Sequence, residues 1–421
     1  MRFIYSIVML LLLPVALPWL AWRTFRQTGH MDRIGDRLGS WPYMQPHETI
    51  WVHGASLGEI RAAAPLVNAL HKSYPNRPIL VTSFSGAGRA HARELFGDRA
   101  MVAQLPYDFP WFVRRWLRSV QPAVGIIIET EIWPNLFAGC ARYKVPLLMI
   151  SARLSARSMR RYRKLQGLIR TALQRVQVVF AQSAGDAERF RELGASPERV
   201  SMGGNLKFDI RFADDLVPRA RALRQRLCPK LAVLVAGSTR DGEEQQVLQA
   251  FAEILRQQSG SVLVLAPRHP ERADTVAALI KKQGFVCRRR SEGETQLQPG
   301  DVLLVDTLGE LTLFYAAGDV AFVGGSLVPV GGHNLLEPAA LGKPVLSGPS
   351  LGNVRESAQA LKEAGVLTLV QDAKSLADAA AWLLANPNMR DRIGQVALDA
   401  VTANRGALER ALKLIEPHLK K

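Results

Sequence analysis

A glycine-rich stretch in the second half of the chain has the residue types that bind nucleotides. It runs from Gly324 to Pro349, directly after the apolar run Val320–Val323. Glycines let a backbone approach a ligand closely, and free N–H groups at a helix start attract phosphate. A carboxylate one turn into that helix, such as Glu337, can accept hydrogen bonds from a ribose. The stretch indicates a site for a nucleotide-linked substrate, although a buried strand–turn–helix joint has the same pattern.

Two further turns have this form, with polar residues between an apolar run and a helical pattern. Arg268 and His269 follow the run 262–266, and a guanidinium binds phosphate through its planar fork. Gly309 and Glu310 follow the run 302–305. A helix-capping role is the alternative for the Arg268 turn. Three ligand-type turns at one sheet edge nevertheless favour a nucleotide site in the second half of the chain.

The first half has carboxylates at similar positions. Glu59 follows the turn Gly54–Gly58 and begins a helical pattern, where it could take a proton from a substrate. An ordinary first-turn glutamate, stabilised by the helix dipole, is the alternative. Glu129 ends an apolar run, so we expect it to point into a cleft, whereas Glu131 could simply cap the next helix. A purely structural role for both carboxylates is the alternative. Lys207 could reach a phosphate or a carboxylate, with a surface lysine as the alternative.

The turn before Glu59 also matches the GxSxG pattern of serine hydrolases, with Ser56 as the nucleophile. That pattern normally follows several strands, and only one strand-like run precedes it here. No histidine near the C-terminal end is convincingly placed as a partner. A serine hydrolase is therefore the least favoured function.

Short apolar runs alternate with helical patterns such as 59–71 and 243–256. Continuously apolar strands between helices are typical of parallel sheets that are covered on both faces. We therefore predict an α/β fold with two Rossmann-like domains facing a cleft. The expected strands are 49–53, 79–84, 123–128, 147–150, 176–181, 231–236, 262–266, 302–305, 320–323, 345–346 and 366–369. The predicted parts are a membrane-anchor helix at 1–22, a first domain at 23–208, a linker at 209–230 and a second domain at 231–421.

Composition limits the partners. The chain has 421 residues and a net charge of +17, which calls for an acidic partner. Its three cysteines lie far apart without a CxxC spacing, and neither a zinc signature nor HExxH is present. No usual RNA-binding aromatic signature is visible, so we expect no nucleic acid and no metal.

The N-terminus predicts a membrane anchor. Phe3 to Trp22 carries no charge and is about 20 residues long, enough to cross a bilayer. Arginines follow it, which places the body in the cytosol by the positive-inside rule. A cleaved signal peptide is the alternative, but it fits poorly because arginines replace the small-residue cleavage site. The basic stretch Arg153 to Arg175 and the segment Trp111–Trp116 are expected to meet anionic lipid, although the latter could equally face the core.

These segments together resemble the Kdo transferases, which add 3-deoxy-D-manno-oct-2-ulosonic acid (Kdo) to lipid A precursors. The resemblance covers essentially the whole chain, including Leu105–Asp108, Glu129–Asn135, Ala152–Ser158, Leu206–Asp209 and Arg268–Arg272. It implies a GT-B glycosyltransferase of the inner membrane that uses CMP-Kdo as donor and inverts the anomeric carbon in lipopolysaccharide biosynthesis. CMP-Kdo is then a substrate, and no cofactor is implied.

The resemblance also implies roles for individual residues. Glu59 matches the general base, and Glu129 and Lys207 match positions that stabilise the transition state. The CMP-binding positions are matched by Arg268, His269, Leu308, Gly309, Glu310, Asn334, Leu335, Leu336 and Glu337. On chemical grounds, apart from the resemblance, we expect the N–H groups near Gly331, Gly332 and the following helix to stabilise the leaving phosphate. Another nucleotide-sugar transferase or epimerase of the same fold, and a non-catalytic binder of anionic lipid, are the alternatives.

Overall fold

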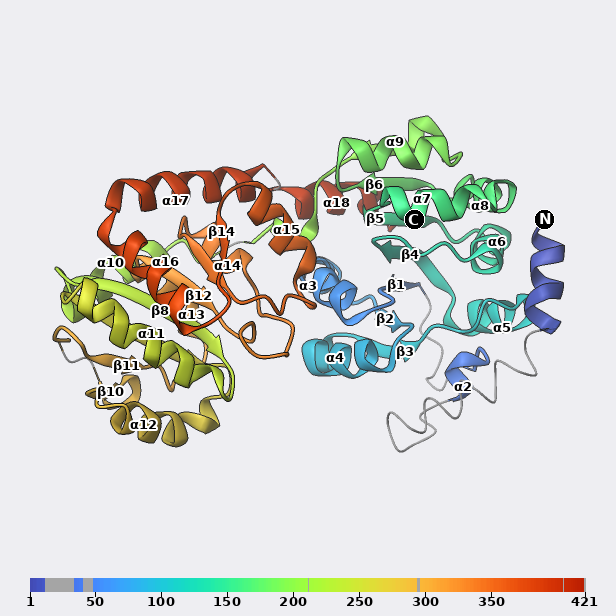
Figure 1. Cartoon of the computed structure of the whole chain (residues 1–421). Helices are drawn as coiled ribbons and strands as arrows, with labels where there is room; N and C mark the ends of the chain where they lie inside the picture. Colours follow the sequence, from blue (N-terminus) through green and yellow to red (C-terminus); the bar gives the residue numbers. More distant parts are fainter. Residues whose placement is uncertain (12–33, 41–47, 211, 294–295, 404, 420–421) are drawn as a thin grey trace. The chain divides into compact units, whose positions relative to one another are not determined.

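A computed structural model describes residues 1–11, 34–40, 48–210, 212–293, 296–403 and 405–419. The chain forms two compact units (Figure 1). The first unit comprises Met1–Asp209 and Asn404–Lys421, and the second comprises Ile210–Ala403. Each unit is an α/β domain built on a parallel sheet, as predicted. The cleft between the units stays a prediction.

The first unit has a seven-stranded parallel sheet in the order β3-β2-β1-β4-β5-β6-β7. Its central strand β4 is apolar along most of its length because helices cover both faces. Ile127 lies in the core on one face, while Ile126 and Ile128 lie in the core on the other. The strands are β1 (Thr49–His53), β2 (Ile79–Ser83), β3 (Met101–Gln104), β4 (Pro122–Ile128), β5 (Leu147–Ala152), β6 (Val178–Ala181) and β7 (Val200–Met202). The helices are α2 (Ile34–Arg37), α3 (Leu57–Ser73), α4 (Gly86–Phe96), α5 (Pro110–Val120), α6 (Pro134–Arg142), α7 (Ala156–Arg163), α8 (Gln166–Leu173) and α9 (Ala184–Glu192), with short 3-10 turns such as η3 (Leu206–Phe208).

The C-terminal helix α18 (Ala407–Ile415) belongs to the first unit, so the predicted second domain at 231–421 is too long. Ala411 and Ile415 are fully buried in the same core cluster as Ile50. The Leu408 N–H donates to Asp209 Oδ2 at 2.7 Å and closes this contact. An amphipathic terminal helix carries no sequence signal for the domain that it will cover.

The second unit has a seven-stranded parallel sheet in the order β10-β11-β9-β8-β12-β13-β14. The strands are β8 (Ala232–Thr239), β9 (Ser261–Pro267), β10 (Cys287–Arg289), β11 (Val302–Leu304), β12 (Val320–Val323), β13 (Val345–Ser347) and β14 (Leu367–Leu369). The helices are α10 (Leu216–Leu227), α11 (Glu243–Gln257), α12 (Ala273–Lys282), α13 (Leu311–Ala317), α14 (Leu336–Ala340), α15 (Arg355–Glu363), α16 (Ala373–Ala385) and α17 (Pro387–Thr402). Most of the predicted linker 209–230 is α10, which Arg224 ties to Asp319 at 2.9 Å. That segment is therefore part of the second unit and not a linker.

The described residues include only the first half of the predicted anchor at 1–22. None of the helices in the described part of the chain combines the length and the apolar composition that crossing a bilayer requires. Residues 2–11 are helical and pack within the first unit. The Tyr5 hydroxyl donates to Asp108 Oδ2 at 3.1 Å, and the Ser6 hydroxyl donates to Asn135 Oδ1 at 3.1 Å. Residues 12–22 of the predicted anchor lie outside the described residues.

Candidate active site

Glu59 lies at the third position of α3, just after β1. Its neighbour Ser56 caps the helix, and its hydroxyl accepts the Glu59 N–H at 3.3 Å. In return the Glu59 carboxylate accepts the N–H groups of Ala55 and Ser56, both through Oε2. Among the described residues Oε1 has no such partner, so it is the oxygen that remains for a substrate proton. The capping role and a catalytic role are therefore compatible in one side chain.

The environment of the Glu59 carboxyl group disfavours its charged form. Burial and, next, the nearby charge of Glu129 together raise its pKa to about 7, although the N–H groups of Ser56 and Ala55 act in the opposite direction. A general base is most effective when its pKa lies near the operating pH. The environment thus suits Glu59 to proton abstraction near neutral pH.

Glu129 and Lys207 form an ion pair at the carboxyl end of β4. The Lys207 Nζ lies 2.5 Å from Glu129 Oε1, with both side chains mostly buried. Glu129 has a left-handed backbone, φ 61°, a conformation that costs a non-glycine residue of order 1–3 kcal/mol. Lys207 is positioned in turn by Asn205, whose Oδ1 accepts the Lys207 N–H at 3.0 Å. Strain and an internal ion pair at a strand end are features of a functional site.

Glu131 also belongs to this site, and it does not take the capping role that the sequence left open for it. Helix α6 begins at Pro134, with Trp133 as its N-cap residue. Burial raises the pKa of the Glu131 carboxyl to about 7, and the charge of Glu59 is the second cause. The spacing Glu-Thr-Glu after a buried strand was the sequence signal that could have identified it.

In the second unit, Arg268 follows β9 and is exposed, and no carboxylate of the described residues forms an ion pair with it. Glu337 lies on α14, and burial raises its pKa, whereas an N–H group of Asn334 at 2.9 Å and the charge of Arg268 lower it. His269 lies 2.7 Å from Arg240, measured between Nε2 and Nη1. Arg240 was not predicted, and its signal was a polar turn, Ser238 to Gly242, after an apolar strand.

Hydrogen bonds of Glu310 fix the turn at Gly309, while the space beside Gly309 is open. Glu310 accepts from Arg290, with 2.8 Å between Oε1 and Nη2, and from the Thr307 hydroxyl. Arg290 is the largest cause that lowers the pKa of Glu310. Leu308 is 82% exposed, and nothing lies within 4 Å of a Cβ built on Gly309. The Glu310 carboxylate thus fixes the turn, and the Leu308–Gly309 backbone is the part open to a ligand.

The predicted phosphate contacts at Gly331 and Gly332 need correction. The Gly331 N–H donates to Ser350 Oγ at 3.0 Å, and the Gly332 N–H donates to Gly325 O at 2.7 Å. Both amides are engaged within the protein and are not available to a phosphate in this structure. Positive φ values of 102° and 77° explain why both residues are glycines.

The helix start beyond them is closed in the same way. Helix α14 has five residues, and the N–H of its first residue, Leu336, donates to Asn334 Oδ1 at 3.1 Å. The side chains of Leu335 and Leu336 are buried in the core. Of the residues predicted in this stretch, Asn334 and Glu337 therefore remain as side chains that could meet a ligand.

The geometry does not support a serine hydrolase. Ser56 has an extended backbone, φ −115° and ψ 166°, and its hydroxyl caps α3, whereas a hydrolase nucleophile occupies a strained turn.

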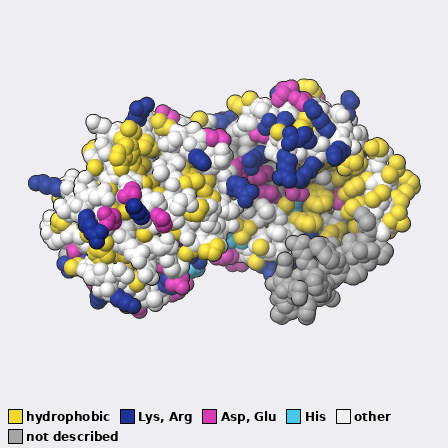
Figure 2. All heavy atoms as spheres, in the orientation of Figure 1, with side chains coloured by type: hydrophobic (Ala, Val, Ile, Leu, Met, Phe, Trp, Pro, Cys, Tyr) yellow, Lys and Arg dark blue, Asp and Glu magenta, His cyan; other side chains and the backbone are white. Residues whose placement is uncertain are grey.

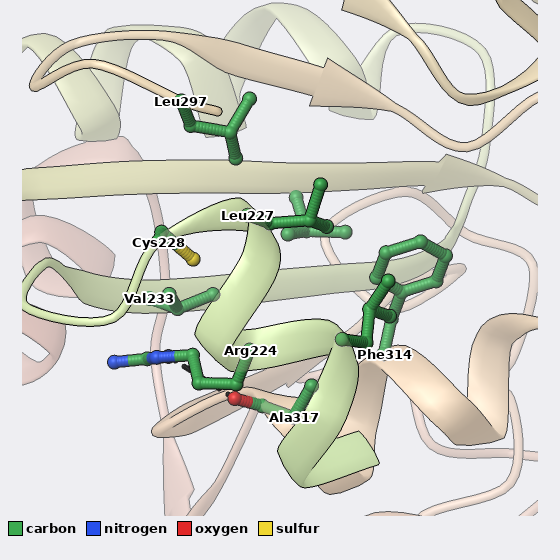
Figure 3. Close-up of a pocket in the computed structure, with 9 residues that line it drawn as sticks. Arg224, Leu227, Cys228, Val233, Leu297, Phe314 and Ala317 are labelled. Carbon is green, nitrogen blue, oxygen red and sulfur yellow. Dashed lines mark hydrogen bonds between the residues drawn. The ribbon is translucent and has the colours of Figure 1, made fainter. Parts of the chain in front are cut away.

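A small pocket of the second unit lies beside α10 and α13 (Figure 3). Its lining includes Leu227, Cys228 and Phe314 and none of the predicted site residues.

Among the described residues, no group of three His, Cys, Asp or Glu side chains is arranged to hold a metal ion. The expectation that no metal is needed stays a prediction.

Two families match parts of the chain. The family described as 3-deoxy-D-manno-octulosonic-acid transferase (kdotransferase) matches residues 32–210, and glycosyl transferases group 1 matches residues 302–399. The 3-deoxy-D-manno-octulosonic acid transferase of Haemophilus influenzae is 36% identical over 423 residues, covering 100% of this chain and 99% of that protein. The enzyme of the same name from Bordetella pertussis is 36% identical over 436 residues and covers 99% of each.

A solved structure agrees with the two-unit fold. UDP-GlcNAc 2-epimerase from Neisseria meningitidis is 13% identical with a TM-score of 0.52, covering 89% of this chain and 100% of that one. This likeness shows the fold alone. The C-terminal CMP-Kdo binding domain of WaaA from Acinetobacter baumannii is 33% identical with a TM-score of 0.43, covering 45% of this chain and 99% of that domain.

Proposed function

The chain belongs to the 3-deoxy-D-manno-octulosonic acid (Kdo) transferase family, and from this premise we propose that it transfers Kdo from CMP-Kdo to a lipid A precursor in lipopolysaccharide biosynthesis. It is a glycosyltransferase whose relatives match it over its full length. The observation that carries the proposal is the carboxylate site of the first unit. There, burial raises the pKa of Glu59 to about 7, and Lys207 is paired with Glu129 at the carboxyl end of β4.

The reaction uses Glu59 as general base. Its free Oε1 takes the proton of a sugar hydroxyl on the acceptor as that oxygen forms a bond to the anomeric carbon of Kdo. The bond from the anomeric carbon to the phosphate oxygen breaks at the same time, and its electron pair leaves with CMP. A single displacement of this kind inverts the anomeric carbon.

Charge that develops in this step needs fixed cationic groups. Lys207 supplies one from the first unit. In the second unit, Arg268 carries a charge that no carboxylate of the described residues neutralises by an ion pair, which supports a role for it against the leaving phosphate. Glu337 and the open Leu308–Gly309 backbone are then available to the ribose and the base of CMP.

The acceptor is a lipid, and we propose that the first unit meets an anionic membrane surface. Figure 2 shows Lys and Arg side chains gathered over α7, beside a hydrophobic surface to which the N-terminal helix contributes. Phe3 is 76% exposed and Leu11 is 73% exposed on that helix. In α5, Trp111 is 46% exposed while Trp116 is buried, so this segment presents one face to the core and one to solvent. The inner-membrane location and the anchor at 1–22 are part of this proposal.

The test is to incubate the detergent-solubilised protein with CMP-Kdo and a tetraacylated lipid A precursor and to read the products by mass spectrometry. A mass gain of one or more Kdo residues is the expected result, and its size counts the additions. No gain from folded protein with intact CMP-Kdo would reject the proposal. UDP-sugars in a parallel reaction test for a different nucleotide-sugar enzyme of the same fold.

A further inference from the structure

Three loops of the second unit meet at the guanidinium of Arg240. Arg240 follows β8, His269 follows β9, and His333 follows β12. Arg240 Nη1 lies 2.7 Å from His269 Nε2, and its Nε donates to His333 Nε2 at 3.2 Å. Because a guanidinium can only donate, each imidazole accepts through Nε2 and carries its ring proton on Nδ1. His269 agrees with this tautomer, since its Nδ1 lies 3.2 Å from Glu271 Oε1.

The cluster has an excess of positive charge. In the described part of the chain no carboxylate forms an ion pair with Arg240, and its two hydrogen-bonded neighbours are imidazoles. Burial lowers the pKa of Arg240, and the charges of Arg268 and Arg272 lower it further. Arg272 is already paired with Asp241 and Glu244, at 2.8 and 2.7 Å. Arg240 and Arg268 are thus left with charge that an anion would neutralise.

A buried carboxylate fixes this arrangement in advance. Glu243 is fully buried, and its Oε2 accepts the N–H groups of Arg240 at 3.1 Å and of Gly325 at 2.7 Å. Its Oε1 accepts those of Ser326 and Leu327, at 3.0 and 2.9 Å. The same carboxylate therefore ties the Arg240 loop to the glycine-rich loop after β12.

The glycine-rich loop in turn positions His333. Gly325 has φ 69°, and a Cβ built on it would lie 2.8 Å from His333 Cδ2. The imidazole thus lies directly against the Gly325 backbone, in space that any other side chain would occupy. Arg240 and both histidines are held before a ligand arrives, which reduces the cost of ordering them on binding.

We propose that Arg240, held between His269 and His333, binds an oxyanion of the sugar nucleotide, either the phosphate of CMP or the carboxylate of the sugar. This rests on the proposed function, which supplies both groups. Of the five N–H groups of a guanidinium, two go to the imidazoles. The three that remain lie on Nη1 and Nη2, the pair that binds a carboxylate or a phosphate through two parallel hydrogen bonds.

The experiment is isothermal titration calorimetry of the full-length, detergent-solubilised protein with cytidine, CMP and CMP-Kdo. Arg240→Gln is expected to weaken binding of the oxyanion-bearing ligands by about 10- to 150-fold, the value of a hydrogen bond to a charged group, and to leave cytidine unchanged. Arg240→Lys should recover only part, because an ammonium lacks the planar fork. Arg256→Gln, at an exposed position on α11, is the matched control.

The ligands separate the possible sources of the anion. Weaker binding of CMP and CMP-Kdo assigns Arg240 to the phosphate, and weaker binding of CMP-Kdo alone assigns it to the sugar carboxylate. Unchanged binding of all three ligands overturns the inference while leaving the proposed function intact. If the wild type binds neither CMP nor CMP-Kdo, both fall.

Variants of His333 distinguish anion binding from simple loop closure. His333→Gln keeps an acceptor for the Arg240 Nε–H group and is expected to bind CMP-Kdo within about threefold of wild type. His333→Leu removes the acceptor and should weaken binding about as much as a neutral hydrogen bond allows, roughly 2- to 12-fold. Equal binding of CMP-Kdo by both variants would contradict the proposal that His333 holds Arg240 in place for the anion. This test can still be made if Arg240→Gln does not fold.

Discussion

Lys207 Nζ lies 2.5 Å from Glu129 Oε1, and this ion pair joins η3 to the carboxyl end of β4. Both residues were predicted from the sequence as candidate site residues. In the structure they stabilise each other's charge, and they lie in the electrostatic neighbourhood of Glu59, whose pKa the Glu129 charge raises. The pair thus influences the base without a direct contact to it.

We expect this pair to show strong coupling in stability. Lys207→Met leaves the mostly buried Glu129 without its cation, and Glu129→Gln does the reverse. The double-mutant cycle should give an interaction energy of about 0.5–3 kcal/mol in urea unfolding, the range for residues in contact. The exposed pair Lys413–Glu409 on α18 is the control, with an expected coupling of about 0.5 kcal/mol or less. Equal coupling for the two pairs would contradict the structural interpretation.

Glu59→Gln should reduce turnover by about 10² to 10⁴, the contribution of a general base. Glutamine still serves the capping box, so helix α3 should remain intact and CMP binding should stay at the wild-type level. Turnover by mass spectrometry and donor affinity by calorimetry check these two statements. Loss of CMP binding in this variant would instead make Glu59 a ligand of the donor.

Ser56→Ala is a matched control for this site. It removes the N-cap of α3 at a cost of about 1 kcal/mol, but a transferase should retain most of its turnover. A serine hydrolase would lose its activity in this variant.

The pH dependence should follow Glu59. Because burial raises the pKa of Glu59 to about 7, the active, deprotonated form increases as pH rises through 7, and kcat/KM should fall about tenfold for each unit below it. Glu129→Gln removes the negative charge that helps to raise the pKa of Glu59, so it should lower this pKa and move the acidic limb of the profile to lower pH. An acidic limb at the wild-type pH would contradict the electrostatic influence of Glu129 on Glu59.

The same shifts predict a stability trend of the opposite sign. Burial raises the pKa values of Glu59, Glu131 and Asp108 to about 7, so the folded state binds more protons than the unfolded state between about pH 4.5 and 7. The free energy of unfolding should therefore fall across this range as pH rises. Urea midpoints at pH 5 and 7 check it, and a rise would contradict the burial of these carboxyls.

Sequence patterns predicted the central strands but not three of the sheet edges. The apolar runs gave β1, β4, β8 and β12 because central parallel strands are buried on both faces. The missed strands β3, β7 and β10 are edge strands of three or four residues. Arg288 and Arg289 in β10 illustrate why: an edge strand can carry charges, and its pairing comes from its neighbour rather than from its own composition.

The site residues also divide into those that the local sequence predicts and those that depend on distant contacts. Arg268 was predictable because it directly follows a buried strand, and Glu59 because it follows the short turn after one. Arg240 and Glu243 were missed because their roles depend on contacts with residues more than 80 positions away, Ser326 and His333 among them. Gly331 was wrongly predicted to bind phosphate. A glycine that is needed for a positive φ looks the same in the sequence as one that exposes its N–H group to a ligand.

Glu243→Gln should destabilise the protein strongly. The carboxylate accepts four N–H groups, and an amide would place its own NH₂ group against two of them. The expected loss is about 2–4 kcal/mol in urea unfolding, in the range for breaking a buried charged network. Glu253→Gln, on the solvent side of the same helix, should change stability by less than about 0.5 kcal/mol. Similar losses in both variants would contradict the role given to Glu243.

Charge reversal on α5 tests the membrane surface. Arg114 and Arg115 are exposed beside Trp111, and a basic residue near an anionic surface contributes about 1 kcal/mol. Arg114→Glu with Arg115→Glu should therefore weaken binding to vesicles rich in anionic lipid by at least about 30-fold, in a form lacking residues 1–22. Arg256→Glu, on α11 of the second unit, is the control and should bind like its parent. Increasing salt should narrow the difference, since exposed charges are screened over about 10 Å at 0.1 M. Unchanged affinity of the double variant would exclude α5 from the membrane contact and leave the N-terminal helix and α7 as the remaining surfaces.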